Sequence, residues 1–286
     1  MLQLIQIRFL TAALLMLPIA NIGAAEQKAG LEIGIAPFLP IKILVQNYAP
    51  LREYLQNRLN EPVTIVSAAD HKTYYQRILK REYPIIIANT NAAYLAWFES
   101  AYVPLLQPIN LTHPVLVVAN SRPFKQLNEL RDKTIAMSDA TAIVSMKGVE
   151  ILREAGLEPG QNVSIVNTPN FSAAINHVIT GEVAAAIVSD RALLQISPAV
   201  REQVKTVYTW GKSAAPGVVY LGSPDMPRDR LEKIKNFILE FAQTTPEGKK
   251  LMADMGYGGL QTIGADDLRP LAPYGALLKK ALGKEP

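Results

Sequence analysis

The chain has 286 residues, of which 49% are hydrophobic and 19% charged, enough apolar material for two modest cores. The formal net charge is +4 and the basic residues are spread along the chain, so no concentrated Lys/Arg stripe predicts nucleic-acid binding. The absence of cysteine excludes disulfides, thiolate nucleophiles and thiolate metal sites.

The first 25 residues have the pattern of a secretory signal peptide. Arg8 supplies the positive start, an apolar run covers 9–19, and Gly23 and Ala25 stand at the minus-three and minus-one positions of a cleavage site. The run is short beside the ~20 residues of a spanning helix, so a membrane anchor is the weaker alternative. We expect a mature protein that begins at Glu26 and is free in the periplasm of a Gram-negative bacterium.

Between residues 31 and 100, short apolar strands alternate with helical patterns. The helices are indicated by apolar residues at spacings of three and four, and 85–88 is a continuous apolar run, as in the middle of a parallel sheet. The predicted order is strand 31–35, helix 45–59, strand 63–66, helix 71–81, strand 85–88 and helix 92–100. This order predicts an α/β lobe.

A second set of βα units follows the apolar segment 115–119. The predicted strands are 134–137, 163–166, 184–188, 204–210 and 218–221, and the helices are 145–155, 172–180, 191–195, 229–244 and 246–255. We therefore predict two α/β lobes joined by two extended hinge crossings, near 115–122 and 207–219. Lobe 1 would comprise 26–118 and 213–286, and lobe 2 would comprise 119–212.

Two lobes with few connections favour hinge closure on a ligand held between them. The carboxyl ends of parallel strands are where α/β folds bind ligands, so we expect the cleft to lie there.

Six segments, in this order and spacing, resemble the phosphate/phosphonate-type substrate-binding proteins of bacterial ABC transporters. They are 33–37, 48–55, 75–79, 124–130, 150–157 and 244–249. The resemblance covers nearly all of the mature chain and implies a type II periplasmic binding protein. Such a protein captures a solute and delivers it to an inner-membrane permease, and we expect it to be a monomer.

The family's phosphonate pocket resembles a Ser-Thr-Ser turn that offers hydroxyl and N–H donors at a helix N-terminus. The matching segment here is 139–144, in which Thr141 is the only hydroxyl. Other polar positions of the family align with Ala88, Ala184 and Ala214 or Ala215. An oxyanion buried without donors is costly, so we expect an uncharged or mostly apolar ligand, such as a sterol or another lipid. The resemblance includes a sterol-handling branch, and a phosphonate- or phosphate-type oxyanion is the alternative.

The candidate ligand contacts stand at strand ends and in the return crossing. They are Phe38, Leu39, His71, Ala88, Asn89, Thr90, Thr141, Asn170, Phe171, Asp190 and Trp210. The alternative for the Asn, Thr and Asp residues is helix capping, and the alternative for Trp210 is packing at the hinge. Ala140, Ile143 and Ala214 would complete an apolar cavity. We expect structural roles for His113 and His177, and the histidine spacing predicts no metal site.

Three classes of function remain. A binding protein for transport, without a cofactor, is the leading class. An enzyme on the same two-lobed fold is the second class. The sequence argues against it, because it contains no nucleophile elbow, phosphate-binding loop or His-Glu-x-x-His helix. The third is a sensor subunit that reports its liganded state to a membrane receptor, and the sequence leaves transport and sensing open.

Overall fold

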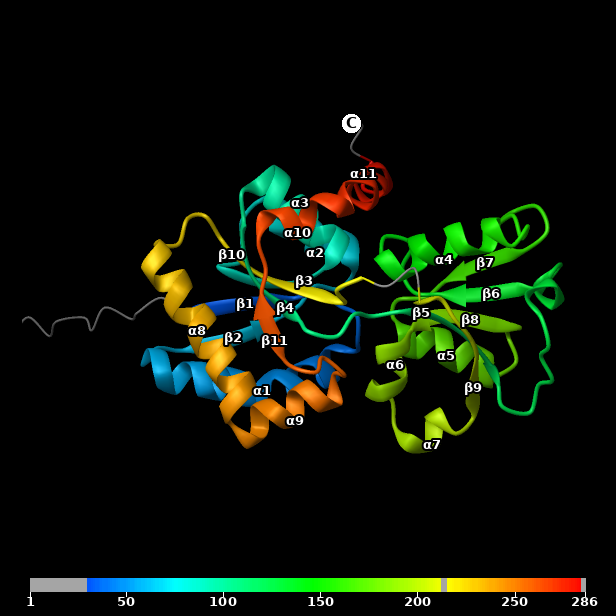
Figure 1. Cartoon of the computed structure of the whole chain (residues 1–286), viewed down its shortest axis with the longest axis horizontal. Helices are drawn as coiled ribbons and strands as arrows, with labels where there is room; N and C mark the ends of the chain where they lie inside the picture. The colour runs from blue at the N-terminus through cyan, green and yellow to red at the C-terminus, as the bar shows by residue number, and fades with distance from the viewer. Residues whose placement is uncertain (1–29, 212–214, 284–286) are drawn as a thin grey trace, which may run out of the picture.

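The structure is a computed structural model that describes residues 30–211 and 215–283. The predicted signal peptide, residues 1–25, lies outside the described residues. The strands form two sheets, each covered by helices on both faces, and the two layered units lie side by side (Figure 1). The expected architecture of two α/β lobes is therefore confirmed.

Lobe 1 is built on a six-stranded sheet of order β11-β4-β10-β3-β1-β2. Its strands are β1 (Leu31–Ile35), β2 (Val63–Val66), β3 (Ile85–Asn89), β4 (Val103–Pro108), β10 (Val218–Gly222) and β11 (Leu260–Thr262). β1 is parallel to β2 and β3, whereas β10 is antiparallel to β3 and β4. All residues of β3 and β10 are buried, because helices cover both faces of the sheet.

The helices of lobe 1 come from both ends of the chain. They are α1 (Ile41–Leu59), α2 (His71–Leu79), α3 (Thr90–Ser100), α8 (Arg228–Thr244), α9 (Pro246–Asp254), α10 (Ala265–Leu268), the 3-10 turn η3 (Arg269–Leu271) and α11 (Ala272–Ala281). Figure 1 shows α2, α3, α10 and α11 over one face and α1, α8 and α9 over the other. The helices from the C-terminal part of the chain therefore pack on lobe 1, and ion pairs such as Arg230–Glu61 join them to the early elements.

Lobe 2 is built on a five-stranded sheet of order β7-β6-β8-β5-β9. Its strands are β5 (Pro114–Ala119), β6 (Thr134–Met137), β7 (Ser164–Asn167), β8 (Ala185–Ser189) and β9 (Val204–Thr209). Its helices are the 3-10 turn η1 (Leu127–Leu130), α4 (Ile143–Glu154), α5 (Phe171–Ile179), α6 (Asp190–Gln195) and α7 (Pro198–Arg201). β6 is parallel to β7 and β8, while β5 is antiparallel to β8 and β9.

The first crossing lies earlier than the sequence predicts. Residues 115–119, which we expected to be part of it, belong to β5, and β5 pairs with β8 and β9 inside lobe 2. The connection between the sheets is therefore 109–113, and the return lies between β9 and β10. The two connections pair with each other, since Thr112 N–H donates to Ala215 O at 2.7 Å and Ala215 N–H donates to Thr112 O at 3.0 Å.

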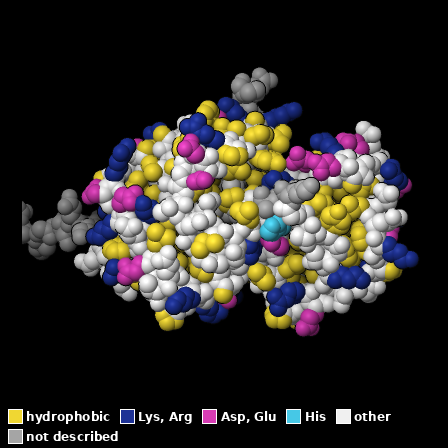
Figure 2. All heavy atoms as spheres, in the orientation of Figure 1, with side chains coloured by type: hydrophobic (Ala, Val, Ile, Leu, Met, Phe, Trp, Pro, Cys, Tyr) yellow, Lys and Arg dark blue, Asp and Glu magenta, His cyan; other side chains and the backbone are white. Residues whose placement is uncertain are grey.

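The carboxyl ends of the parallel strands in both lobes face the space between the lobes. Figure 2 shows this space as a groove on one face of the molecule, with basic side chains scattered over both lobes. Among the described residues, no helix combines the length and the apolar character needed to cross a membrane.

Candidate functional site

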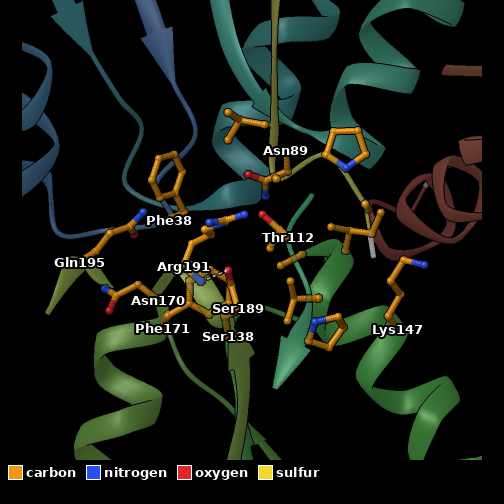
Figure 3. Close-up of a pocket in the computed structure, with 18 of the residues that line it drawn as sticks. Phe38, Asn89, Thr112, Ser138, Lys147, Asn170, Phe171, Ser189, Arg191 and Gln195 are labelled. Carbon is orange, nitrogen blue, oxygen red and sulfur yellow. Dashed lines mark hydrogen bonds between the residues drawn. The ribbon is translucent and has the colours of Figure 1, made fainter. Parts of the chain in front are cut away.

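A cavity lies between the lobes, with an empty volume of about 710 Å³ that includes space open to solvent. Its lining comes from strand ends in both lobes, from the first turns of α4, α5 and α6, and from the two crossings (Figure 3). The lining residues are Phe38, His71, Asn89, Thr112, Pro114, Ser138, Ala142, Ile143, Val144, Lys147, Asn170, Phe171, Ser189, Arg191, Gln195, Ala215, Pro216, Gly217, Val218 and Tyr257.

Arg191 is the lining residue that the sequence analysis missed and that bears most on ligand chemistry. The hydroxyl of Ser189 caps α6 by accepting a hydrogen bond from the Arg191 N–H at 3.1 Å. This cap fixes the first turn of α6, and the side chain reaches toward Phe38 and Asn89 (Figure 3). Its Nη2 donates to Leu111 O, in the first crossing, at 2.6 Å. Its buried Nε has no hydrogen-bond partner among the described residues.

Asp190 only partly neutralises Arg191. Its Oδ1 lies 3.8 Å from Arg191 Nε, a long ion pair, and the same oxygen accepts from His113 N–H at 3.1 Å. Its Oδ2 lies 3.0 Å from His113 Nδ1. Asp190, a predicted ligand contact, therefore lies against His113 and is not among the lining residues.

Lys147 is the second cation of the lining and was also missed. It projects from α4, and its Nζ donates to Tyr274 Oη of α11 at 3.1 Å, which joins the two lobes. Tyr274 in turn donates to Glu150 Oε2 at 3.1 Å. Burial lowers the pKa of Lys147, and the charge of Glu150 opposes this effect.

A buried polar cluster forms the lobe 1 wall. His71 Nδ1 lies 3.4 Å from Tyr75 Oη and 3.5 Å from Asn89 Nδ2, and Asn89 also donates to Tyr75 Oη at 3.3 Å. Burial lowers the pKa of His71, although the carboxylates of Asp139 and Asp70 act in the opposite direction. Burial therefore favours the neutral form of the His71 imidazole.

The N-terminus of α4 also faces the cavity. Its N-cap, Ala142, has no capping side chain, and Ile143 and Val144 of the first turn are lining residues. Asp139 lies just before it and accepts from Thr141 N–H at 2.8 Å and from the Thr141 hydroxyl. The Thr141 hydroxyl, on which the sequence comparison of the turn centred, is therefore already occupied.

Five of the predicted contacts are brought together at the cavity: Phe38, His71, Asn89, Asn170 and Phe171. The others lie outside its lining. Leu39 and Ala88 are buried in the core of lobe 1, and the Thr90 hydroxyl donates to Pro216 O. Trp210 packs against Tyr208 with 4.7 Å between ring centroids, as in the hinge alternative. Ligand contact by any of these residues stays a prediction.

The alignment that placed Ala184 at the cleft is wrong. Ala184 precedes β8, and its N–H bonds to Thr134 O at the start of β6. It therefore stands at the opposite end of the strands from Ser138 and Ser189, which line the cavity. Asn89 was predicted as a ligand contact because it is a polar residue at the end of a predicted strand. Arg191 stands at a similar place after β8, so its basic side chain could have been predicted as a contact in the same way.

Two lobes around a shared cleft define the class of this chain as a two-lobed binding protein of type II periplasmic fold. Residues 33–268 match the family model described as "ABC transporter, phosphonate, periplasmic substrate-binding protein". The chain therefore belongs to this family, whose members bind substrates for transporters in the periplasm. The predicted resemblance is confirmed.

Several solved structures share the fold. A binding protein component of an ABC phosphonate transporter from Pseudomonas aeruginosa is 15% identical, with 87% of this chain and 86% of that chain covered and a TM-score of 0.75. PhnD1 from Prochlorococcus marinus, in complex with methylphosphonate, is 12% identical, with coverages of 87% and 98% and a TM-score of 0.76. The aliphatic sulphonate binding protein SsuA from Escherichia coli is 14% identical, with coverages of 89% and 88% and a TM-score of 0.60. No match was found among curated proteins.

Proposed function

We propose that this chain captures a small organic oxyanion of the phosphonate type between its lobes and presents it to an inner-membrane ABC transporter. The observation that carries the proposal is the charge of the cavity wall. Its described lining residues include Arg191 and Lys147 but no aspartate or glutamate. Asp190 forms only a long ion pair with Arg191, so cations in a wall of low dielectric favour an anionic ligand here.

Two kinds of donor support this ligand. The buried Nε of Arg191 has no hydrogen-bond partner among the residues that the structure describes, and a guanidinium matches the planar spacing of oxyanion oxygens. The first turn of α4 adds backbone N–H groups that no capping side chain occupies, at the positive end of the helix dipole. The sequence-based objection to an oxyanion was a lack of donors, and these groups remove it.

The apolar part of the wall favours an organic substituent on the oxyanion. The apolar lining residues are Phe38, Pro114, Ala142, Ile143, Val144, Phe171, Ala215, Pro216 and Val218. Their burial by a ligand contributes roughly 25 cal/mol per Å² of apolar surface. A sterol or another lipid, our first expectation, gains no support from the family match, which favours the oxyanion alternative.

Isothermal titration calorimetry of the mature protein with methylphosphonate, ethylphosphonate and phosphate tests the proposal. We expect micromolar binding of at least one phosphonate. Arg191→Gln should weaken it by roughly 10- to 100-fold, the value of a hydrogen bond to a charged group. Arg131→Gln is the matched control, because it removes the same charge from an exposed position of lobe 2.

Two results would contradict the proposal. One is the absence of any oxyanion binding tighter than about 1 mM. The other is equal affinity in the wild type and Arg191→Gln. If lipid extract from a Gram-negative host binds while the oxyanions do not, the neutral, apolar ligand of our first expectation replaces the phosphonate.

A further inference from the structure

The two cations of the cavity wall do not lie together. Figure 3 shows Lys147 on one side, whereas Arg191 lies nearer the other, beside Phe38 and Asn89, and the apolar lining residues include Ile143, Val144 and Val218. A single small oxyanion at Arg191 leaves the ammonium of Lys147 without an anionic partner. The cavity therefore offers two separate positions for negative charge, joined by an apolar stretch.

The ammonium of Lys147 is fixed but not neutralised. Tyr274 holds it twice, through the hydrogen bond to its hydroxyl and through its ring, whose centroid lies 4.5 Å from Nζ. Glu150 Oε2 accepts a hydrogen bond from the Tyr274 hydroxyl. Lys147 itself makes no ion pair with a described residue. Because an ammonium has more N–H donors than the one that Tyr274 uses, donors remain for a ligand.

We infer that the ligand carries an acidic group at each end, an oxyanion at Arg191 and a second anion, such as a carboxylate, at Lys147. This inference rests on the proposed function and refines its substrate class to phosphonocarboxylate-type dianions. It also predicts that aminoalkyl phosphonates bind weakly. Their ammonium would lie next to Lys147 in a wall whose described residues include no carboxylate to receive it.

A matched ligand series tests the inference by calorimetry. The series consists of phosphonates whose spacer of two to four methylene groups ends in a methyl, an ammonium or a carboxylate group. The three terminal groups are compared at each spacer length. For at least one spacer, we expect the carboxylate to bind about tenfold more tightly than the methyl, and the ammonium to bind least tightly. In Lys147→Met the advantage of the carboxylate over the methyl compound should disappear, so that the affinities of the two compounds agree within about twofold.

Lys133→Met is the control, because this lysine is exposed and immediately precedes β6, at the end of the strand away from the cavity. Retained binding of the methyl compound shows that Lys147→Met is folded. The inference fails alone if methyl compounds bind as tightly as carboxylates at every spacer, or if the carboxylate advantage survives in Lys147→Met. If no phosphonate of the series binds the wild type, the proposed function fails and this inference with it.

Discussion

At the scale of single residues, the chemistry of the cleft depends on groups that the fold withdraws from water. His71 is 2% exposed, and burial keeps its pKa below the ordinary value. Arg191 is half-buried, with 16% of its side chain exposed and with one buried N–H that has no hydrogen-bond partner among the described residues. Both groups therefore carry a desolvation cost, which a bound anion would relieve for Arg191 and which makes His71 sensitive to pH.

The lowered pKa of His71 predicts how stability depends on pH. As the pH falls below about 7, the unfolded chain binds a proton at residue 71 more readily than the folded protein does, so the free energy of unfolding should fall as the pH drops from 7 toward 5. Urea unfolding at pH 7 and pH 5 measures this change. In His71→Asn the loss should be smaller than in the wild type. An equal loss would show that His71 does not carry the effect.

At the scale of elements, Arg191 is held from the side by the turn after α9. Gly256 has φ +67°, and a Cβ at this position would lie 2.5 Å from Arg191 Nη1 and 2.7 Å from Leu194 Cδ1. The turn of lobe 1 therefore approaches α6 of lobe 2 this closely only because residue 256 lacks a side chain.

Gly256→Ala should weaken phosphonate binding by about tenfold, because it displaces Arg191. It should also cost about 1–2 kcal/mol of stability through the left-handed backbone. Gly160→Ala provides the matched control, since Gly160 has φ +81° and open space around its Cβ position. It should show a similar stability cost with unchanged affinity in calorimetry. Equal affinity losses in the two variants would exclude a specific role for Gly256.

Local patterns predicted most elements but not their partners. The apolar run of β5 identifies a strand, yet nothing in it shows pairing with β8 and β9, so it was assigned to a crossing. β4 was missed because Pro104 and Pro108 argue against a strand. The short α7, α10 and β11 have too few residues to show a period.

At the scale of the whole molecule, the two lobes were predictable because the βα pattern begins again after one long apolar strand. The contacts that join them were not, since they link distant segments. Asn91 of lobe 1 donates to Thr141 O of lobe 2 at 2.6 Å, and Lys147 and Tyr274 are 127 residues apart in the chain. The sequence therefore does not identify Lys147 as a cavity residue, because its position depends on the packing of α11 against α4. These contacts support closure of the lobes over a ligand.

The central claim is that an oxyanion lies between the lobes on Arg191. A crystal structure of the mature protein grown with methylphosphonate tests it most directly. We expect the phosphonate oxygens within hydrogen-bond distance of the Arg191 guanidinium, beside the first turn of α4, with Lys147 still bound to Tyr274. Methylphosphonate bound elsewhere, or a cleft that holds a neutral lipid in its place, would contradict the account.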